Sequence, residues 1–393
     1  MILENIGHLS TFNSESGKVE TASNTSLAIE NGKIVENGGG EVIDCGGALI
    51  TPGFVDPHTH PVFLDSREEE FAQKLAGVSY EEIAAQGGGI VASIIGVRNA
   101  SKDELVERVF RRMDRFLKLG TTTVECKSGY GLDTESELKS LQVIHEVNNS
   151  HEIDMVPTFL GAHAFPTEFA DDHDGYVDLL CKEMIPAVAE QGIAVFCDVF
   201  CENGYFDVEQ SHRILETAKD HGITPRLHAD EFEDSGAAEL AAEVGAVSAD
   251  HLMAVSEAGI KKLSENNVTA TLLPGTTFFL GKDTYAPART LMENNIDIAL
   301  ATDFNPGSCH IQSMPFIISL ACIHLGLTVE ESFAAATYFS AKALNLEDKV
   351  GSISIGRQAD LIIWDIDRLM EIPYNVTDLA IKMVIKNGKA IDS

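Results

Sequence analysis

The sequence predicts an α/β fold, a (β/α)8 TIM-like barrel with a small β-sandwich domain built from both termini. Two observations lead to this prediction. Short runs of β-branched and apolar residues alternate with amphipathic helical patterns eight times along the middle of the chain. Both ends carry an Asn-Gly pair between apolar runs, which is the signature of a tight β-hairpin.

The eight apolar runs lie between residue 48 and about residue 330, a span close to the typical barrel length of about 250 residues. In order, they cover residues 48–55, 121–127, 155–162, 195–201, 223–228, 246–251, 268–273 and 297–303. Segments with the apolar spacing of helices lie between them, at residues 103–118, 134–148, 208–220, 235–244 and 256–266. We therefore expect a barrel over residues 48–346, with its function at the C-terminal ends of the strands.

The two ends of the chain are expected to form one small β domain, residues 1–47 together with residues 347–393. The hairpin signals are Asn31-Gly32 and Asn387-Gly388, and residues 359–364 supply a further strand-like run. Neither end can bury a core alone. A sheet assembled from both ends would bury the apolar faces of each.

The charge balance excludes several classes of partner. The chain has 61 acidic and 28 basic side chains, and its formal net charge of −33 repels phosphate backbones and anionic lipid surfaces. We therefore expect no nucleic acid partner and no membrane association. The same acidity fits both adaptation to high salt and an ordinary soluble enzyme.

Cysteine usage and the N-terminal residues indicate a cytoplasmic protein. The seven cysteines are scattered and include no Cys-x-x-Cys pair, so neither a disulfide framework nor a zinc knuckle is indicated. The first residues lack the basic and apolar segments of a signal peptide, and no run of about 18 apolar residues occurs. A reducing compartment is the simpler interpretation.

Two histidines one residue apart, His58 and His60, follow the first apolar run. Alternation along an extended segment places both on one face, where they can hold one metal ion. A chain with 13 histidines can produce such a pair by chance, so the interpretation depends on partners. His228, His251 and Asp303 supply them, because they end the fifth, sixth and eighth runs at the same mouth of the barrel. Three of these four imidazoles together with the carboxylate would suit Zn²⁺ or Fe²⁺ and leave an open position for water.

Seven motifs are spread over nearly the whole chain. They are TPGFVDPHTH at 51–60, ECKSGYG at 125–131, GAHA at 161–164, HADE at 228–231, SADHL at 248–252, LPGTTF at 273–278 and ATDFNPGS at 301–308. With these motifs the chain resembles the amidohydrolase superfamily and, within it, the imidazolonepropionase family. The first motif is general to the superfamily, whereas the second, third and last are characteristic of the narrower family.

The resemblance implies an activity and a site. The activity would be hydrolysis of the cyclic amide in 4-imidazolone-5-propanoate, a small anionic substrate, to N-formimidoyl-L-glutamate, the third step of histidine degradation. The family also leads us to expect a homodimer. The metal-ligand positions would be His58, His60, His228 and Asp303, with His251 as an additional histidine near the reacting centre. The substrate-contact positions would be Arg67, Tyr130, His163, Glu231, Asn305, Gly307 and Ser308.

Residue chemistry gives Glu231 and His251 catalytic roles that fit this reaction. Glu231 lies three residues past His228, where its carboxylate could take a proton from water and return it to the departing ring nitrogen. The alternative for Glu231 is an ordinary surface acid. His251 could steady the water or the developing oxyanion by hydrogen bonding, and its alternative is a purely structural role.

Other predicted contacts each have a structural alternative. Arg67 could hold a propionate bidentately, or it could pair with one of the acids in 68–70. Tyr130 and His163 offer hydrogen bonds at the ends of the second and third runs, or they could serve in packing. The stretch 305–308 could present hydrogen bonds to a ligand, or it could be a plain turn.

The number of metal ions can also be predicted from the resemblance. Two-metal members of the superfamily commonly use a carbamylated lysine at the end of the fourth strand, but here the fourth run ends in Phe200-Cys201-Glu202. Lys127 belongs to the second run. We therefore expect one divalent ion per subunit, Zn²⁺ or Fe²⁺, although Glu202 leaves a second ion open.

Two other functions compete with this prediction. A nucleobase deaminase of the same superfamily would share the barrel and the metal ligands, but Tyr130, His163 and the 305–308 stretch argue against it. A noncatalytic scaffold would be expected to lack ligands, and this chain retains all of them.

Overall fold

The computed structural model describes residues 1–78, 82, 87–376 and 380–391. Eight parallel strands pair in chain order, and a bridge between Thr59 and Phe304 brings the first and last strands of this sheet together. The predicted barrel is therefore confirmed. Its strands are β6 (Phe54–Asp56), β7 (Thr121–Lys127), β8 (Asp154–Ala162), β9 (Phe196–Cys201), β10 (Thr224–Ala229), β11 (Ser248–His251), β12 (Thr269–Leu272) and β13 (Ile298–Leu300).

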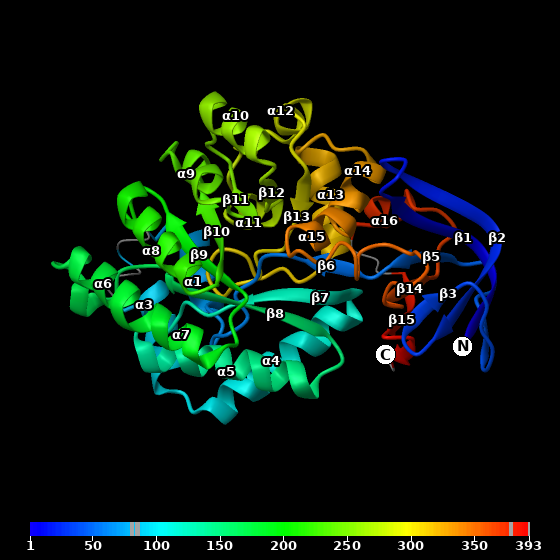
Figure 1. Ribbon diagram of the computed structural model, residues 1–393, viewed down its shortest axis with the longest axis horizontal. Coiled ribbons are helices and arrows are strands. Elements are labelled where there is room, and N and C mark those ends of the chain that lie inside the picture. The colour runs from blue at the N-terminus through cyan, green and yellow to red at the C-terminus, as the bar shows by residue number, and fades with distance from the viewer. Residues whose placement is uncertain (79–81, 83–86, 377–379, 392–393) are drawn as a thin grey trace.

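Helices surround this sheet (Figure 1). Five of them match the predicted helical segments closely: α4 (Lys102–Lys118), α5 (Thr134–Ser150), α8 (Val208–Asp220), α9 (Ala237–Val244) and α10 (Glu257–Asn266). The others are α1 (Glu68–Leu75), α3 (Ile90–Asn99), α6 (His173–Leu179), α7 (Ile185–Gln191), α11 (Pro274–Phe279), α12 (Ala288–Glu293), α13 (Met314–His324), α14 (Val329–Ala335), α15 (Tyr338–Lys342) and α16 (Glu371–Tyr374). No helix in these described ranges is both long enough and apolar enough to cross a membrane.

Helix α4 illustrates why the predicted helices form where they do. Its buried residues Leu105, Val109 and Met113 recur at four-residue spacing and face the barrel. Ser101 caps the first turn in a capping box with Glu104, which satisfies backbone N–H groups that would otherwise lack partners. The opposite face of α4 is therefore free to carry charged residues.

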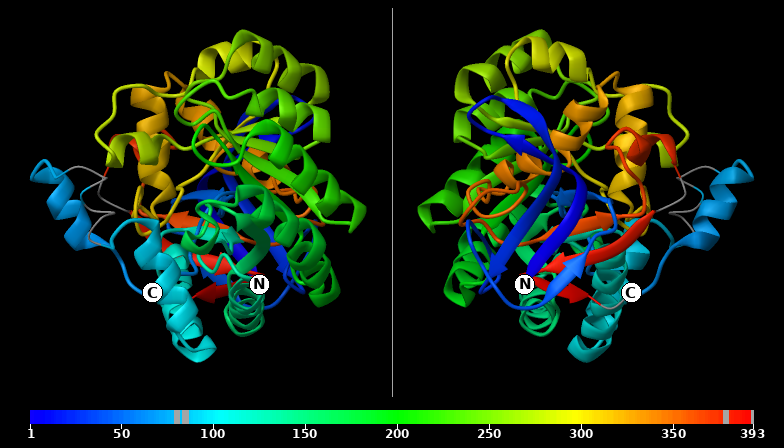
Figure 2. Two further views of the ribbon diagram at one scale, coloured as in Figure 1. Left: turned by 90° about the vertical axis from the view of Figure 1, so that its left-hand side faces the viewer. Right: turned by 90° about the vertical axis from the view of Figure 1, so that its right-hand side faces the viewer.

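Both termini contribute to a second, mixed sheet, as predicted (Figure 2). Figure 2 shows N-terminal strands in blue beside C-terminal strands in red. Both Asn-Gly pairs form hairpin turns with positive φ at each residue, and they join β2 to β3 and β15 to β16. The strands are β1 (Ile2–Asn13), β2 (Lys18–Glu30), β3 (Lys33–Val35), β4 (Val42–Asp44), β5 (Leu49–Pro52), β14 (Leu361–Trp364), β15 (Ile381–Lys386) and β16 (Lys389–Ile391).

The predicted first strand at 48–55 is two strands rather than one. Strand β5 pairs with β1 and β14 in the terminal sheet, whereas β6 pairs with β7 in the barrel. Gly53 separates them, and a Cβ atom at this position would lie 2.4 Å from the Thr122 side chain. Because both strands are fully buried, their residues form one continuous apolar run, and the sequence pattern does not show that the chain passes from one sheet to the other.

A buried ion pair joins the terminal sheet to the barrel. The Nζ atom of Lys386 on β15 lies 2.6 Å from Asp360 and 2.8 Å from Asp154 at the start of β8, and the Lys386 side chain is fully buried. Replacing Lys386 with Met would leave Asp360 buried beside a second carboxylate.

We expect Lys386→Met to lower the free energy of unfolding by about 3–5 kcal/mol, because a buried charge would lose its partner. Chemical denaturation followed by circular dichroism measures this change. Lys389→Met, at an exposed position of the same hairpin, is the control. Equal stability of the two variants would contradict the role assigned to Lys386.

Candidate active site

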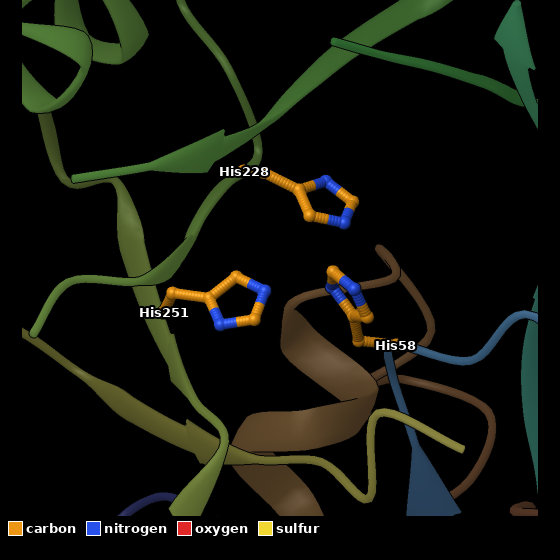
Figure 3. A group of neighbouring side chains, drawn as sticks. All are labelled: His58, His228 and His251. Carbon is orange, nitrogen blue, oxygen red and sulfur yellow. The ribbon is translucent and has the colours of Figure 1, made fainter. Parts of the chain in front are cut away.

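Three histidines from three strand ends face a common space (Figure 3). His58 follows β6, His228 lies in β10 and His251 ends β11. Each offers a ring nitrogen within 4.8 Å of the others. All three side chains are buried. Their convergence follows from the barrel, because the C-terminal ends of parallel strands meet at one mouth.

A second group shares His58 and adds His60 and Asp303. The Nε2 atoms of His58 and His60 are 3.2 Å apart, and Asp303 Oδ1 lies 3.7 Å from the first and 3.4 Å from the second. Thr276 donates a hydrogen bond to Asp303 Oδ2 at 2.5 Å, which leaves Oδ1 directed at the histidines. The five residues singled out in the sequence therefore lie together.

A buried carboxylate fixes the orientation of His58. Its Nδ1 lies 2.6 Å from Asp250 Oδ2, and the same oxygen accepts a hydrogen bond from Arg226 Nη2 at 2.7 Å. An ionised carboxylate can only accept hydrogen bonds, so Nδ1 carries the proton. The Nε2 lone pair of His58 is consequently directed into the site.

His228 is held in the same way by a different carboxylate. Its Nδ1 lies 3.1 Å from Asp198, which also contacts Lys127 Nζ at 2.7 Å. Burial alone would raise the pKa of Asp198, but the hydrogen bond from His228 and the positive charge of Lys127 hold that pKa well below its usual range. Asp198 is therefore an acceptor, and the Nε2 lone pair of His228 also faces the site.

Glu125 connects these two arrangements beneath the histidines. It lies 2.8 Å from Lys127 Nζ and 3.7 Å from Arg226, and it accepts the backbone N–H of Thr59 at 3.0 Å. Glu125 and Lys127 are on β7, Asp198 is on β9 and Arg226 is on β10. Strands β7 and β9 are not neighbours, so these contacts cross the barrel interior.

The donors fit a divalent metal ion. Burial lowers the pKa of both His58 and His60 well below the ordinary histidine value, so both rings are neutral and can donate a lone pair. Two ring nitrogens and a carboxylate oxygen lie within 3.7 Å of one another, and His60 Nδ1 has no hydrogen-bond partner within the described chain. With its proton on Nδ1, His60 would direct an Nε2 lone pair at the same point as His58 and Asp303, where a cation could bind all three.

Glu231 and His251 form a pair beside these donors. Glu231 Oε2 lies 3.7 Å from His251 Nε2. Burial, reinforced by the nearby Asp303, raises the pKa of Glu231 well above the usual carboxyl range, and burial lowers the pKa of His251 to about 3. Neither ring nitrogen of His251 has a hydrogen-bond partner within the described chain. The pair combines a carboxyl group suited to proton transfer with a neutral imidazole facing the site.

The backbone is strained at the same strand ends. Asp230, His251 and Asp303 adopt φ values of 50°, 82° and 54°, in the left-handed region that residues with side chains seldom occupy. Such strain costs free energy and persists where the surrounding structure fixes a side-chain direction. Here it aims His251 and Asp303 into the site.

A cavity of about 470 Å³ opens above these residues. All the substrate-contact residues expected from the family resemblance line it: Arg67, Tyr130, His163, Glu231, Asn305, Gly307 and Ser308. The cavity is therefore of a size for a small molecule and extends from the histidine cluster to a guanidinium group.

Arg67 packs directly against Gly307. A Cβ atom added at Gly307 would lie 1.9 Å from Arg67 Nη2, so glycine is required for the guanidinium to occupy this position. Arg67 Nε also lies 3.2 Å from Glu70 in the next helical turn. Arg67 therefore makes an ion pair with one of the acids in 68–70, which was the structural alternative, and it also lines the cavity.

Tyr130 and His163 lie beside His60. The ring of His163 stacks on His60 with centroids 5.1 Å apart and contacts Tyr130 at 5.2 Å. Burial lowers the pKa of His163 well below its ordinary value, so the ring is neutral, and its Nδ1 donates to the Gly129 carbonyl at 2.8 Å. Its Nε2 is then an acceptor, while the Tyr130 hydroxyl, whose pKa burial raises, is a donor.

Asn305 shapes the turn that carries Gly307 and Ser308. Its Oδ1 accepts both of their backbone N–H groups, at 2.8 and 2.7 Å, and its Nδ2 donates to the Asp303 carbonyl and the Ser308 hydroxyl. These contacts satisfy the amide within its own turn. The side chain of Asn305 therefore serves to present its neighbours to the cavity.

The end of the fourth barrel strand offers no free carboxylate to the site. Glu202 accepts hydrogen bonds from the backbone N–H groups of Asn203 and Phe232, at 2.9 and 2.8 Å. Lys127 lies on β7, the second barrel strand, as predicted, and its ammonium group is paired with Glu125 and Asp198.

Several cavity and support residues were missed from the sequence. Lys74 and Lys282 line the cavity, as do the aromatic residues Phe200, Tyr205 and Phe232. The support residues had a usable signal, because charged side chains at 125, 198, 226 and 250 fall inside otherwise apolar runs. Phe200 lies in β9 and Lys74 lies on the short helix α1, whereas Tyr205, Phe232 and Lys282 lie in loops, where no periodic pattern marks them.

Known proteins resemble this chain in sequence over most of their length. The model of the amidohydrolase family matches residues 49–391. An imidazolonepropionase of Alkaliphilus metalliredigens is 47% identical over 377 residues, which cover 93% of this chain and 89% of the relative. An imidazolonepropionase of Geobacillus thermodenitrificans is 49% identical over 354 residues, with 90% and 83% coverage.

Solved structures agree on the fold. A 5-methylcytosine deaminase from Klebsiella pneumoniae superposes with a TM-score of 0.76 at 18% identity, covering 100% of this chain and 98% of its own. An adenosine deaminase from Xanthomonas campestris with bound zinc gives 0.74 at 19% identity, with 99% and 92% coverage. At identities below 20%, these superpositions show similarity of fold only. The matched family model and the sequence relatives together show that the chain belongs to the amidohydrolase family and, within it, to the imidazolonepropionases.

Proposed function

We propose that this chain hydrolyses the cyclic amide of 4-imidazolone-5-propanoate to N-formimidoyl-L-glutamate in histidine degradation. One observation carries the proposal: a single cavity has Glu231 beside a set of metal-type donors and Arg67 in its wall. This arrangement suits a substrate that has an amide to be opened and a carboxylate to be held. The high identity to imidazolonepropionases supports the same substrate.

The proposal includes one divalent ion per subunit, Zn²⁺ or Fe²⁺, held by His58, His60, His228 and Asp303. Imidazole and carboxylate donors suit either ion. When bound, such an ion supplies an acidified water, with a pKa near 7, and polarises the substrate carbonyl. The engagement of Glu202 and Lys127 in other contacts supports a single ion.

Glu231 moves the proton in the proposed reaction. Its carboxylate accepts a proton from the attacking water as the new C–O bond forms at the ring carbonyl carbon. The C–N bond of the ring then breaks, and Glu231 returns the proton to the departing nitrogen. His251, 3.7 Å from Glu231, contributes a neutral ring that can hydrogen-bond to the oxygen gaining charge.

Arg67, Tyr130 and His163 orient the substrate. The planar guanidinium of Arg67 binds the propionate with two parallel hydrogen bonds. In a chain of net charge −33, an anionic substrate needs such a local positive group. Tyr130 and His163, with one donor and one acceptor facing the cavity, suit the polar edge of the imidazolone ring. The proposal also includes a cytoplasmic location, which rests on the composition, and a homodimer, which rests on the family resemblance.

The direct test follows the loss of imidazolone absorbance with purified protein of measured metal content. We expect turnover by metal-loaded protein and formation of N-formimidoyl-L-glutamate. Failure of fully loaded protein to consume the substrate would overturn the assignment.

Glu231→Gln should lower kcat by about 10²–10⁴-fold, because the amide cannot accept the proton. The metal content should be unchanged, which separates proton transfer from metal loss. Glu233→Gln, an exposed change two residues along the chain, is the control. Full activity of Glu231→Gln would remove Glu231 from the mechanism.

Gly307→Ala should raise KM at least about tenfold, because the added methyl group would displace the Arg67 guanidinium that binds the propionate. Gly39→Ala, where a Cβ atom meets nothing within 4 Å, is the control. Steady-state kinetics measures both. An unchanged KM would show that the position of Arg67 does not govern substrate binding.

Asp250→Asn and Asp198→Asn should each weaken metal affinity by about 10–100-fold, because each carboxylate fixes the orientation of one histidine. Competition with a chelator, followed with Co²⁺ or Zn²⁺, measures affinity without reference to activity. Asp234→Asn, at an exposed position, is the control. Wild-type affinity in folded Asp250→Asn protein would contradict this support role.

A further inference from the structure

A second cavity, of about 280 Å³, is lined by arginines. Arg108, Arg111, Arg112 and Arg115 extend into its wall from one face of α4, and residues 63–66 with Phe304, His310 and Gln312 complete it. Asp65 is the one acidic residue in this lining. The chain as a whole has 61 acidic and 28 basic side chains, whereas this cavity has four arginines and one aspartate in its wall. Its charge is therefore opposite in sign to the net charge of the chain.

Arg112 has a structural role in this cavity. It donates to the carbonyls of Pro61 and Phe63 at 2.8 and 2.6 Å, and its guanidinium lies 3.4 Å above the Phe63 ring. Burial, with repulsion from Arg108, lowers the pKa of Arg112 to about 9. Arg112 therefore holds the segment that follows His60, and the remaining arginines are available for another purpose.

The other three arginines differ in how closely acidic groups approach them. Arg108 approaches Asp65 only to 3.6 Å, and Arg111 pairs with Glu107 on its own helix. The Arg115 guanidinium has neither an ion-pair nor a hydrogen-bond partner among the described residues. Guanidinium groups gathered around one cavity give it a positive potential that attracts anions. Guanidinium groups bind oxyanions through pairs of N–H donors.

We propose that this cavity is a binding site for a small multivalent oxyanion, recognised by Arg108, Arg111 and Arg115. The ligand would carry a phosphate group or two carboxylates, because three cations exceed what a single carboxylate needs. The cavity volume of about 280 Å³ limits the ligand to a small molecule, and the rings of His310 and Phe304 form part of its wall.

The arginine-lined cavity lies next to segments that build the catalytic cavity, but no side chain lines both cavities. Phe304 is the neighbour of Asp303, and Ser66 is the neighbour of Arg67. None of the four arginines lines the catalytic cavity. The anion site therefore stands apart from the proposed reaction, and its occupancy can be measured whether or not the enzyme turns over substrate.

Isothermal titration at constant ionic strength, with inorganic phosphate and with glutarate in separate experiments, tests the site. We expect saturable binding of at least one of them, at one per chain, and an affinity at least about tenfold weaker in Arg108→Gln/Arg115→Gln. Binding of phosphate alone or of glutarate alone would identify the group recognised. The control Lys261→Gln/Arg368→Gln removes two charges from exposed positions elsewhere and should bind as wild type.

Three results would overturn the proposal. The first is no saturable binding of either anion at millimolar concentration. The second is equal weakening in the control variant, which would indicate a general effect of net charge. The third is a change in oligomeric state of Arg108→Gln/Arg115→Gln without anion binding by wild type, which would assign the arginines to contact with a second copy of the chain.

Discussion

The active site depends on a network of buried charges that crosses the interior of the barrel. Glu125 lies between two cations, Lys127 and Arg226, and each cation holds one further carboxylate. Those carboxylates, Asp198 and Asp250, each fix one histidine. The usual interior of such a barrel is packed with branched apolar residues. Here ion pairs take the place of part of that apolar packing. Two of the carboxylates in these pairs determine which nitrogens of His58 and His228 face the cavity.

This network explains why the site can be rigid and still bind a cation. Buried charges are costly unless they are paired and hydrogen-bonded, and every member contacts at least one opposite charge. Three carboxylates oppose two cations, which leaves one excess negative charge beneath the histidines. That excess favours a divalent ion above it. The left-handed backbone at His251 and Asp303 adds a second constraint, since it directs their side chains into the same space.

The sequence was a good guide to the barrel and to the rim of the site. The run 121–127 coincides with β7, and His58, His60, His228, His251 and Asp303 converge because parallel strands end at one mouth. The run 48–55 was interpreted wrongly as a single strand, because two buried strands in different sheets look like one apolar stretch. Contacts such as Lys127 to Asp198 depend on strand register across the barrel, which a local pattern does not contain. Lys74, on the short helix α1, and Lys282, in a loop, reach the cavity only through the three-dimensional fold.

The central claim is that Asp250 and Asp198 keep the protons of His58 and His228 on Nδ1, so that both Nε2 lone pairs face the site. Nitrogen-15 NMR of the metal-free protein at neutral pH, with each histidine assigned by substitution, measures this directly. The account predicts a protonated Nδ1 and an unprotonated Nε2 in both rings. A proton on Nε2 of either ring would contradict it.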